Sequence, residues 1–388
     1  MSVGVTERKG PAYPAARKVA EAVAGRFARL AEKARAAGKS GLAAVPDAAT
    51  VEAVIDAAFW ASLRREEGYP PKISLAFLPP EQAEPPLMFA RTLPLAARAL
   101  ARLAPAVERP GIHLGVWHCG ESGELCVWGT TRAIPRLCFV LEVVEPGLLV
   151  VKYRRGRDPG KFGNVVVLHG DEVKVVNEGG ASVPDCPGMV TSLLGFGSAA
   201  TPADQVDVLV QLAVSMREHQ RGGTLLVVPA GSDAWRESVL WSSAYVMKPP
   251  FTELTEVLAR GEAEGDDPEG QEALRRAVDA VAGLTAVDGA AIINDRSELL
   301  AFGAKIIQSR SGSEVERVMV TEPVAGAEPE VVDPAELGGT RHLSAAQFVQ
   351  DQRDTLALVA SQDGRFTVFA WSPCDAMVHA HRVETLLL

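Results

Sequence analysis

The sequence has little of what marks disulfide-stabilised, secreted or membrane proteins. It contains five cysteines among 388 residues, odd in number and irregularly spaced. This pattern argues against a disulfide framework and favours reduced thiols in a cytoplasmic protein. No stretch approaches the ~18 uncharged apolar residues that a membrane helix requires. Residues 1–10 hold no apolar run of the kind found in signal peptides, so we expect neither a membrane anchor nor a secretion signal.

Positive charge is also scarce. The formal net charge is −10, whereas domains that bind nucleic acids in general usually carry a strong basic excess. The sequence therefore predicts that the protein is not a general nucleic-acid binder, and only local basic sites remain possible.

The chain is long and rich in apolar residues. Its 388 residues, 47% of them hydrophobic, are enough for two domains of roughly 100–200 residues with cores of their own.

The first half of the chain changes from helical to β-rich patterns. Apolar residues recur at helical spacing in 15–37 and 48–65, which predicts two helices that pack on each other or on a partner domain, with oligomerisation as the alternative role. A third helix is expected at 93–103. Candidate strands with short gaps between them then predict an antiparallel meander: 114–117, 124–128, 137–144, 148–153, 164–168 and 172–176. We interpret 1–68 as N-terminal helices and 69–200 as an α+β sensor or regulatory domain.

Two local features of this region have both a functional and an ordinary interpretation. His118, Cys119 and Cys126 place three possible metal ligands close together. No second Cys/His pair follows at zinc-finger spacing, which favours thiols buried in a hairpin. Residues 152–157, with Lys161 nearby, form a basic patch that suits phosphate or an anionic effector. A solvated hairpin turn is the favoured interpretation of that patch.

The second half reads as a separate domain, 201–388. Residues 177–202 are rich in Gly, Ser, Ala and Pro, and we place the junction there. Helices are predicted at 202–221, 251–260, 271–284 and 343–350, and strands at 224–228, 290–293, 298–302, 356–360 and 366–371. Their alternation predicts an α/β fold with a mixed sheet flanked by helices. The long loop 308–337 is either a lid over a site or a peripheral insertion.

Two short motifs in this domain carry a chemical signal. The run Gly338-Gly339-Thr340-Arg341-His342 directly precedes the predicted helix. It offers free backbone N–H groups at a helix start together with a fixed cation, which suits a phosphate group. The run Asp288-Gly289-Ala290 opens a buried apolar strand and so places a carboxylate at a strand edge. A carboxylate and a basic helix start are the two halves of a nucleotide–metal site.

The order of these motifs resembles the diadenylate cyclase (DAC) domain, the nucleotide-binding domain of DisA-type proteins. The resemblance covers about residues 204–371, through Asp-Gly-Ala, strand, long loop, Gly-Thr-Arg-His, helix and strand. It implies that each domain holds one ATP, and that two domains face each other to make cyclic di-AMP with a divalent metal, Mg or Mn. Self-association, at least as a transient dimer, would then be needed for turnover.

The resemblance also implies roles by position. Asp288 matches the family's aspartate and is expected to place the metal or to polarise the attacking hydroxyl. Arg341 and His342 are expected to contact phosphate, and His342 is also a candidate metal ligand. The remaining expected nucleotide-binding positions are Gly289 and Ala290, where small residues let the nucleotide approach the backbone, then Gly339, Thr340 and Ser344, and an adenine pocket at Gly303 to Ile306.

The sequence departs from the family's pattern at two places. Leu343 stands where the family has a second arginine, so one phosphate cation is missing. Lys305 or an arginine of the loop 308–337 is a candidate replacement. The family's Ser-Glu-Glu motif appears here as Ser361-Gln362-Asp363, and Asp363 is expected to supply the metal-binding carboxylate one position later.

The leading hypothesis is a cytoplasmic nucleotidyltransferase that condenses two ATP into cyclic di-AMP or a related cyclic dinucleotide. The retained Asp288, Arg341 and His342 favour it. The changes at Leu343 and Gln362 favour the alternative, a degenerate domain that binds a nucleotide as a sensor without turnover. A third hypothesis is a nucleotide-binding scaffold whose N-terminal module acts through protein contacts. Chance occurrence of both motifs on an ordinary α/β domain is the remaining interpretation.

Overall fold

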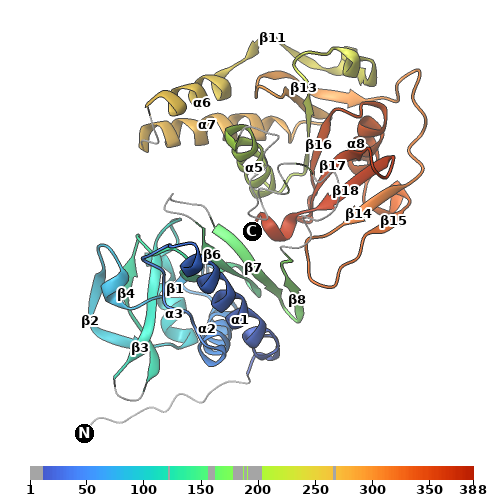
Figure 1. The fold of residues 1–388 in the computed structure, drawn as a ribbon. Coiled ribbons are helices and arrows are strands. Elements are labelled where there is room, and N and C mark those ends of the chain that lie inside the picture. The colour runs from blue at the N-terminus through green and yellow to red at the C-terminus, as the bar shows by residue number, and fades with distance from the viewer. Residues whose placement is uncertain are drawn as a thin grey trace. The chain divides into compact units, whose positions relative to one another are not determined.

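The computed structural model describes residues 12–120, 123–155, 162–177, 203–264 and 268–388, together with Pro187 and Val190. The chain forms two compact units, residues 1–176 (unit 1) and 177–388 (unit 2), each with its own sheet and helices (Figure 1). The expected α/β fold class with mixed sheets is confirmed. Within the described ranges, no helix is long and apolar enough to cross a membrane. The predicted junction at 177–202 lies almost entirely outside them.

Unit 1 is built on an eight-stranded sheet with the order β2-β4-β3-β1-β5-β6-β7-β8. The strands are β1 Ile73–Phe77, β2 Leu87–Pro94, β3 His113–Cys119, β4 Glu124–Thr131, β5 Phe139–Glu145, β6 Leu148–Arg154, β7 Phe162–His169 and β8 Glu172–Val175. Strands β5 to β8 form the expected antiparallel meander. Strand β1, however, lies between β3 and β5 and is parallel to β3. An early strand is thus inserted at the centre of the sheet, which makes the sheet mixed.

Three helices complete unit 1: α1 Pro14–Ala36, α2 Ala48–Ser62 and α3 Ala97–Leu103. Proline suits the first turn of α1, where its missing N–H is not needed. Asp47 caps α2 by accepting a hydrogen bond from the Thr50 N–H at 2.8 Å. Helices α1 and α2 pack on each other, and their buried side chains share one core with the sheet. Both helices are therefore part of the fold of unit 1.

The segment 87–103 differs from its prediction. We expected a helix over 93–103, but 87–94 forms strand β2 and α3 begins only at Ala97. Strand β2 is largely exposed and pairs with β4 alone, at the edge of the sheet. Pro94 is tolerated there because an edge strand does not need every N–H for pairing. The Ala- and Leu-rich composition that follows extended the helix prediction too far towards the N-terminus.

The expectation of reduced thiols is wrong for two cysteines. Cys119 on β3 and Cys126 on β4 are joined by a disulfide. Register explains it, because these antiparallel neighbours pair Trp117 with Cys126 and Cys119 with Glu124, which brings the two sulfurs to adjacent positions. The bond removes both cysteines from a metal site with His118. Cys138 is a buried free thiol, and burial raises its pKa.

The favoured interpretation of the basic patch was a solvated hairpin turn, but two of its residues are held by contacts within the fold. Lys152 is buried on β6, and its Nζ lies 2.5 Å from a carboxylate oxygen of Glu142. Arg154 donates a hydrogen bond to the Ile134 carbonyl. The patch residues 156, 157 and 161 lie outside the described ranges.

Unit 2 contains a ten-stranded mixed sheet. The strands are β9 Gly223–Val228, β10 Val239–Leu240, β11 Tyr245–Phe251, β12 Ala290–Asn294, β13 Leu299–Ile306, β14 Val318–Thr321, β15 Glu330–Val332, β16 Leu356–Ala360, β17 Phe366–Ser372 and β18 Met377–Arg382. Their order is β10-β13-β12-β9-β16-β17-β18-β14-β15, and β11 also pairs with β13. The central strand β9 is parallel to β12 and antiparallel to β16.

The helices of unit 2 are α5 Ala203–Glu218, α6 Glu253–Glu264, α7 Pro268–Leu284 and α8 Thr340–Asp351. Phe348 of α8 packs in one core cluster with Leu226 of β9 and Phe369 of β17. Because Leu225 is fully buried as well and points to the opposite face, both faces of the sheet are covered. Helices α5 and α7 pack side by side (Figure 1).

The segment 308–337 is not a structureless loop. It contributes β14 and β15 to the edge of the sheet. Strand β14 is parallel to β18, and β15 is antiparallel to β14. At β14 and β15, the segment is therefore a peripheral extension of the sheet.

Candidate functional site

The glycine pair at the start of α8 allows a close turn into the helix. Gly339 is the N-cap residue in extended conformation, and no side chain caps the helix start. A Cβ at Gly338 would lie 2.7 Å from His342 Nδ1, so a side chain there would displace the imidazole. The backbone N–H groups of the first turn thus face their surroundings without a competing side-chain acceptor.

A pocket of about 330 Å³ opens at this helix start. Two segments that are distant in sequence line it: Gly339, Thr340, Arg341 and His342 from α8, and Ser361, Gln362 and Asp363 from the turn between β16 and β17. The turn reaches α8 because β16 pairs directly with β17 and α8 packs against both strands. The structure therefore brings the Gly-Thr-Arg-His motif together with the segment that stands for the family's Ser-Glu-Glu motif.

Arg341 is half-buried at the pocket, and a glycine makes room for it. Gly222, which precedes β9, has φ +70°, and a Cβ there would lie 2.8 Å from Arg341 Nη1. The positive φ and the close approach both favour glycine at this position. In the sequence, Gly222 only follows the predicted helix 202–221. Its link to the arginine depends on tertiary contacts.

His342 is almost completely buried, with 3% of its surface exposed. Its Nε2 has no hydrogen-bond partner within the described residues. Its ring centroid lies 6.1 Å from that of Phe369, edge to face. Burial lowers the pKa of His342, while the Asp363 carboxylate acts in the opposite direction. The side chain is thus a neutral imidazole near pH 7. Its Nε2 can donate or accept one hydrogen bond, depending on the tautomer.

The turn between β16 and β17 supplies polar groups on the other wall. The Gln362 side-chain amide donates to the Arg221 carbonyl at 3.4 Å. Asp363 is exposed, and its carboxylate lies 3.3 Å from Arg365 Nε. Asp363 therefore faces the pocket as an already paired carboxylate.

Asp288 does not line this pocket. It lies before β12, its side chain is 91% exposed, and its Oδ2 is 3.8 Å from Lys305 Nζ. Gly289 next to it has φ +108°, and a Cβ there would lie 2.6 Å from the backbone carbon of Gly303. The Asp-Gly-Ala motif thus needs its glycine because strand β13 passes directly over it.

Of the other expected nucleotide-binding positions, Gly339 and Thr340 line the pocket, whereas five lie outside it: Gly289, Ala290, Gly303, Ile306 and Ser344. Ala290 is buried and pairs with Ala304, and Ile306 pairs with Val239 of β10. Ser344 is half-buried on α8, and Leu343 is 42% exposed.

One aromatic side chain near Gly303 was missed. Tyr245 is 61% exposed and stacks on Phe302 with a centroid distance of 4.9 Å. A Cβ at Gly303 would lie 2.9 Å from the Tyr245 ring. The segment around Tyr245 has no strong apolar periodicity, so only the pairing of β11 with β13 reveals this neighbour.

The expected metal ligands do not assemble within one chain. Among the described residues, no three His, Cys, Asp or Glu side chains form a group that could hold a metal ion. His342 and Asp363 line the same pocket, whereas Asp288 lies outside it. The donor set of a single chain therefore does not fit a divalent cation, and we derive no step through one.

Comparison with known proteins adds three findings. The family described as "Probable sensor domain DACNV" matches residues 40–132, within unit 1. No curated protein matches the chain. A solved structure of DacA from Staphylococcus aureus, a double mutant, is similar with 12% identity over 45% of this chain and 85% of that chain, at a TM-score of 0.25. That likeness is too slight to place residues of one chain on the other, while the family match associates residues 40–132 with a sensor role.

Proposed function

We propose that unit 2 binds ATP or a related nucleotide with its phosphates at the start of α8, and that two copies condense two ATP into cyclic di-AMP. The observation that carries the proposal is the shared pocket of Gly339 to His342 and Ser361 to Asp363. These are the segments that the resemblance to diadenylate cyclase domains assigns to the phosphates of the nucleotide and to the metal, respectively. Helix α8 and strand β16 separate them in sequence, and the packing of α8 on β16 and β17 brings them to one pocket.

The chemistry of the pocket suits a phosphate chain. Free N–H groups at the start of α8, the Arg341 guanidinium and the neutral His342 imidazole are donors or cations that stabilise phosphate oxygens. In the proposed reaction, the 3′-hydroxyl of each ATP attacks the α-phosphate of the other. Two phosphodiester bonds form and two pyrophosphates leave. Such transfers depend mainly on alignment and charge neutralisation.

In this proposal, the exposed Asp288 acts in the assembly of two copies. Its carboxylate is open to solvent outside the pocket, so it is available to a second copy or to a nucleotide that spans the face between copies. One chain then provides half of a reaction centre. Mg or Mn, which the resemblance implies, would be held only in such an assembly, and a cytoplasmic site of action belongs to the same proposal.

The second candidate is a nucleotide sensor without turnover. Leu343 in place of the family's arginine is 42% exposed at the helix start, where a cation would otherwise stand. Gln362 cannot bind a metal as a glutamate does, and its amide already bonds the Arg221 carbonyl. Both changes remove a group that would help to neutralise the phosphates, directly or through a metal. Arg341 and the helix start, which would bind the nucleotide, are retained.

Turnover and binding separate the two candidates. Purified protein is incubated with ATP and Mg or Mn, products are identified by mass spectrometry, and ATP affinity is measured by calorimetry. We expect a cyclic dinucleotide whose rate of formation falls about 100-fold or more in Asp288→Asn. In Arg341→Gln we expect ATP affinity to fall about tenfold or more. The matched controls are Asp354→Asn and Arg260→Gln, exposed positions away from the pocket.

The rate per molecule should also rise with protein concentration, because the reaction needs two copies. ATP binding that depends on Arg341 without any product would leave the sensor candidate. Neither product nor ATP binding would refute both.

A further inference from the structure

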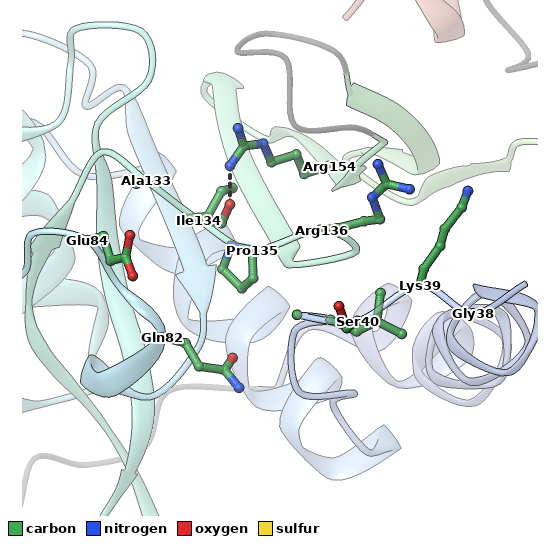
Figure 2. A pocket seen from close by; sticks show the side chains of 12 residues that line it. Gly38, Lys39, Ser40, Gln82, Glu84, Ala133, Ile134, Pro135, Arg136 and Arg154 are labelled. Carbon is green, nitrogen blue, oxygen red and sulfur yellow. Dashed lines mark hydrogen bonds between the residues drawn. The ribbon is translucent and has the colours of Figure 1, made fainter. Parts of the chain in front are cut away.

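Unit 1 has a cavity of its own, of about 650 Å³, at the turn that follows α1 (Figure 2). Its walls come from the turn Gly38 to Leu42, from Gln82 and Glu84, from Ala133 to Arg136, and from Arg154. The volume lies in the range of pockets that bind small molecules. Ser40 to Leu42, Gln82 and Glu84 lie within the sensor-family match at residues 40–132, whereas the remaining wall residues lie outside it.

The walls are held together by backbone hydrogen bonds. The Ala43 N–H donates to the Arg136 carbonyl at 2.9 Å, and Leu42 forms a parallel bridge with Arg136. The Leu137 N–H donates to the Arg154 carbonyl at 2.9 Å. The turn after α1 and the segment before β5 are thus fixed to each other, and a ligand would enter a pocket that is already formed.

Three cations gather at this pocket of a chain whose net charge is −10. Arg154 donates to the Ile134 carbonyl, which fixes its guanidinium in the wall. Lys39 and Arg136 form no ion pair with a carboxylate within the described ranges. Figure 2 shows Lys39 and Arg136 extending in the same direction on one side of the pocket, with Gln82 and Glu84 on the other.

The turn after α1 adds neutral donors beside these cations. Gly38 and Gly41 have φ of +70° and +66°, which the tight turn around Ser40 requires. In the part of the chain that the structure describes, the backbone N–H groups of Ser40 and Gly41 have no protein acceptor. The Ser40 hydroxyl is exposed on the same turn. Lysine, arginine, hydroxyl and backbone N–H groups together are typical of a phosphate site.

We propose that this pocket binds a small organic phosphate. Lys39, Arg136 and the Ser40 turn hold the phosphate. The hydroxyl or amino groups of the organic part donate to Gln82 and Glu84 on the opposite side. The two sides have opposite character, so the pocket favours a molecule with an anionic end and a hydrogen-bond-donating end. An inorganic anion offers no hydrogen-bond donor to Glu84.

Calorimetric titration of the full chain tests the proposal with three probes: inorganic pyrophosphate, ribose 5-phosphate and adenosine 5′-monophosphate. We expect an organic phosphate to bind more tightly than pyrophosphate, and the two organic probes distinguish a sugar phosphate from a nucleotide. Arg136→Gln and Lys39→Gln should each weaken binding about tenfold, as expected when one charge-assisted hydrogen bond is lost. Arg132→Gln is the matched control, because Arg132 is exposed, changes the charge equally and does not line the pocket.

Two further variants locate the ligand. Glu84→Gln should weaken binding of ribose 5-phosphate and should not weaken that of pyrophosphate, because the change removes a negative charge from the pocket. Arg341→Gln in unit 2 should leave binding of ribose 5-phosphate unchanged, and because this sugar phosphate is no substrate or product of the proposed reaction, the test does not depend on that reaction. Binding lost in Arg341→Gln but kept in Arg136→Gln would overturn the proposal, since the phosphate would then sit at α8. Pyrophosphate binding as tightly as both organic probes, or no binding of any probe, would overturn it too.

Discussion

Leu343 is the position in the proposed nucleotide site where a substitution could restore the missing phosphate-binding cation. Its side chain is 42% exposed on the first turn of α8, one position after the buried His342. The surrounding surface therefore has room for a longer side chain that reaches phosphate. Arginine there would add a bidentate cation to a site that has Arg341 alone on this turn.

We expect Leu343→Arg to raise ATP affinity or the rate of product formation about tenfold, the effect of one charge-assisted hydrogen bond. Calorimetry and the turnover assay measure the two effects separately. Leu63→Arg is the control, because Leu63 is 50% exposed in unit 1 and the change in charge is the same. An unchanged affinity and rate in Leu343→Arg would place the phosphates elsewhere.

At the scale of elements, β18 carries two buried histidines in the interior of the sheet of unit 2. Nδ1 of His381 lies 2.7 Å from the Thr321 hydroxyl of β14. Burial lowers the pKa of His381 to about 3, and the neighbouring His379 acts in the same direction. The unfolded chain takes up this proton near pH 6.5, whereas the folded imidazole stays neutral. The unfolded state thus binds more protons between these values, and the stability of unit 2 falls as pH decreases through this window.

We expect the free energy of unfolding of unit 2 to fall by about 2 kcal/mol from this histidine between pH 7 and pH 5. Urea unfolding at a series of pH values measures the slope. The slope should become shallower in His381→Asn, whatever the absolute stability of the variant. His169→Gln, at an exposed histidine of unit 1, is the control. A slope equal in wild type and His381→Asn contradicts the prediction.

The elements also show how far sequence patterns reach. Strong periodicity predicted α1, α2, α5 and α7 and most central strands, because burial of one face or of both leaves a clear apolar pattern. Strand β2 was not predicted, because an exposed edge strand has no buried face and so no apolar pattern. Strand β18, with the sequence Met-Val-His-Ala-His-Arg, was not predicted because its two histidines are buried, and the hydrogen bond of His381 to Thr321 is one that only tertiary structure supplies.

The candidate site divides in the same way. Local spacing identified the start of α8, where Gly339 and the following residues create the helix N-terminus by themselves. Their meeting with Ser361 to Asp363 required the β16–β17 hairpin and the packing of α8 on it. The position of Asp288 outside this pocket could not be predicted, because it depends on the order of β12 and β9 in the sheet. Pairing of Cys119 with Cys126 likewise follows from strand register, which a count of cysteines does not contain.

At the scale of the whole molecule, the two units have separate cores. Ile55 of α2 is fully buried among residues of unit 1 only, and Ile292 of β12 among residues of unit 2 only. Each core is therefore able to unfold as its own cooperative unit.

We expect calorimetric unfolding in two transitions. Ile55→Ala should lower the stability of one by about 2–5 kcal/mol, the usual effect of truncating a buried isoleucine, and leave the other in place. Ile292→Ala is the reciprocal variant and should move the other transition alone. A single transition that both variants shift equally would show that the units unfold together.

The order of strands in unit 2 has a consequence for how the protein is made. Strand β9 lies at the centre of the sheet, yet its neighbour β16 comes far later in the chain, so that Leu225 pairs with Leu358. While a ribosome extends the chain, β9 has an open edge of hydrogen-bonding groups until α8 and β16 have emerged. Long-range pairing of this kind folds slowly and exposes apolar strands to aggregation. Unit 1 pairs its sheet from nearer segments and completes first, so chaperones should be needed mainly for unit 2.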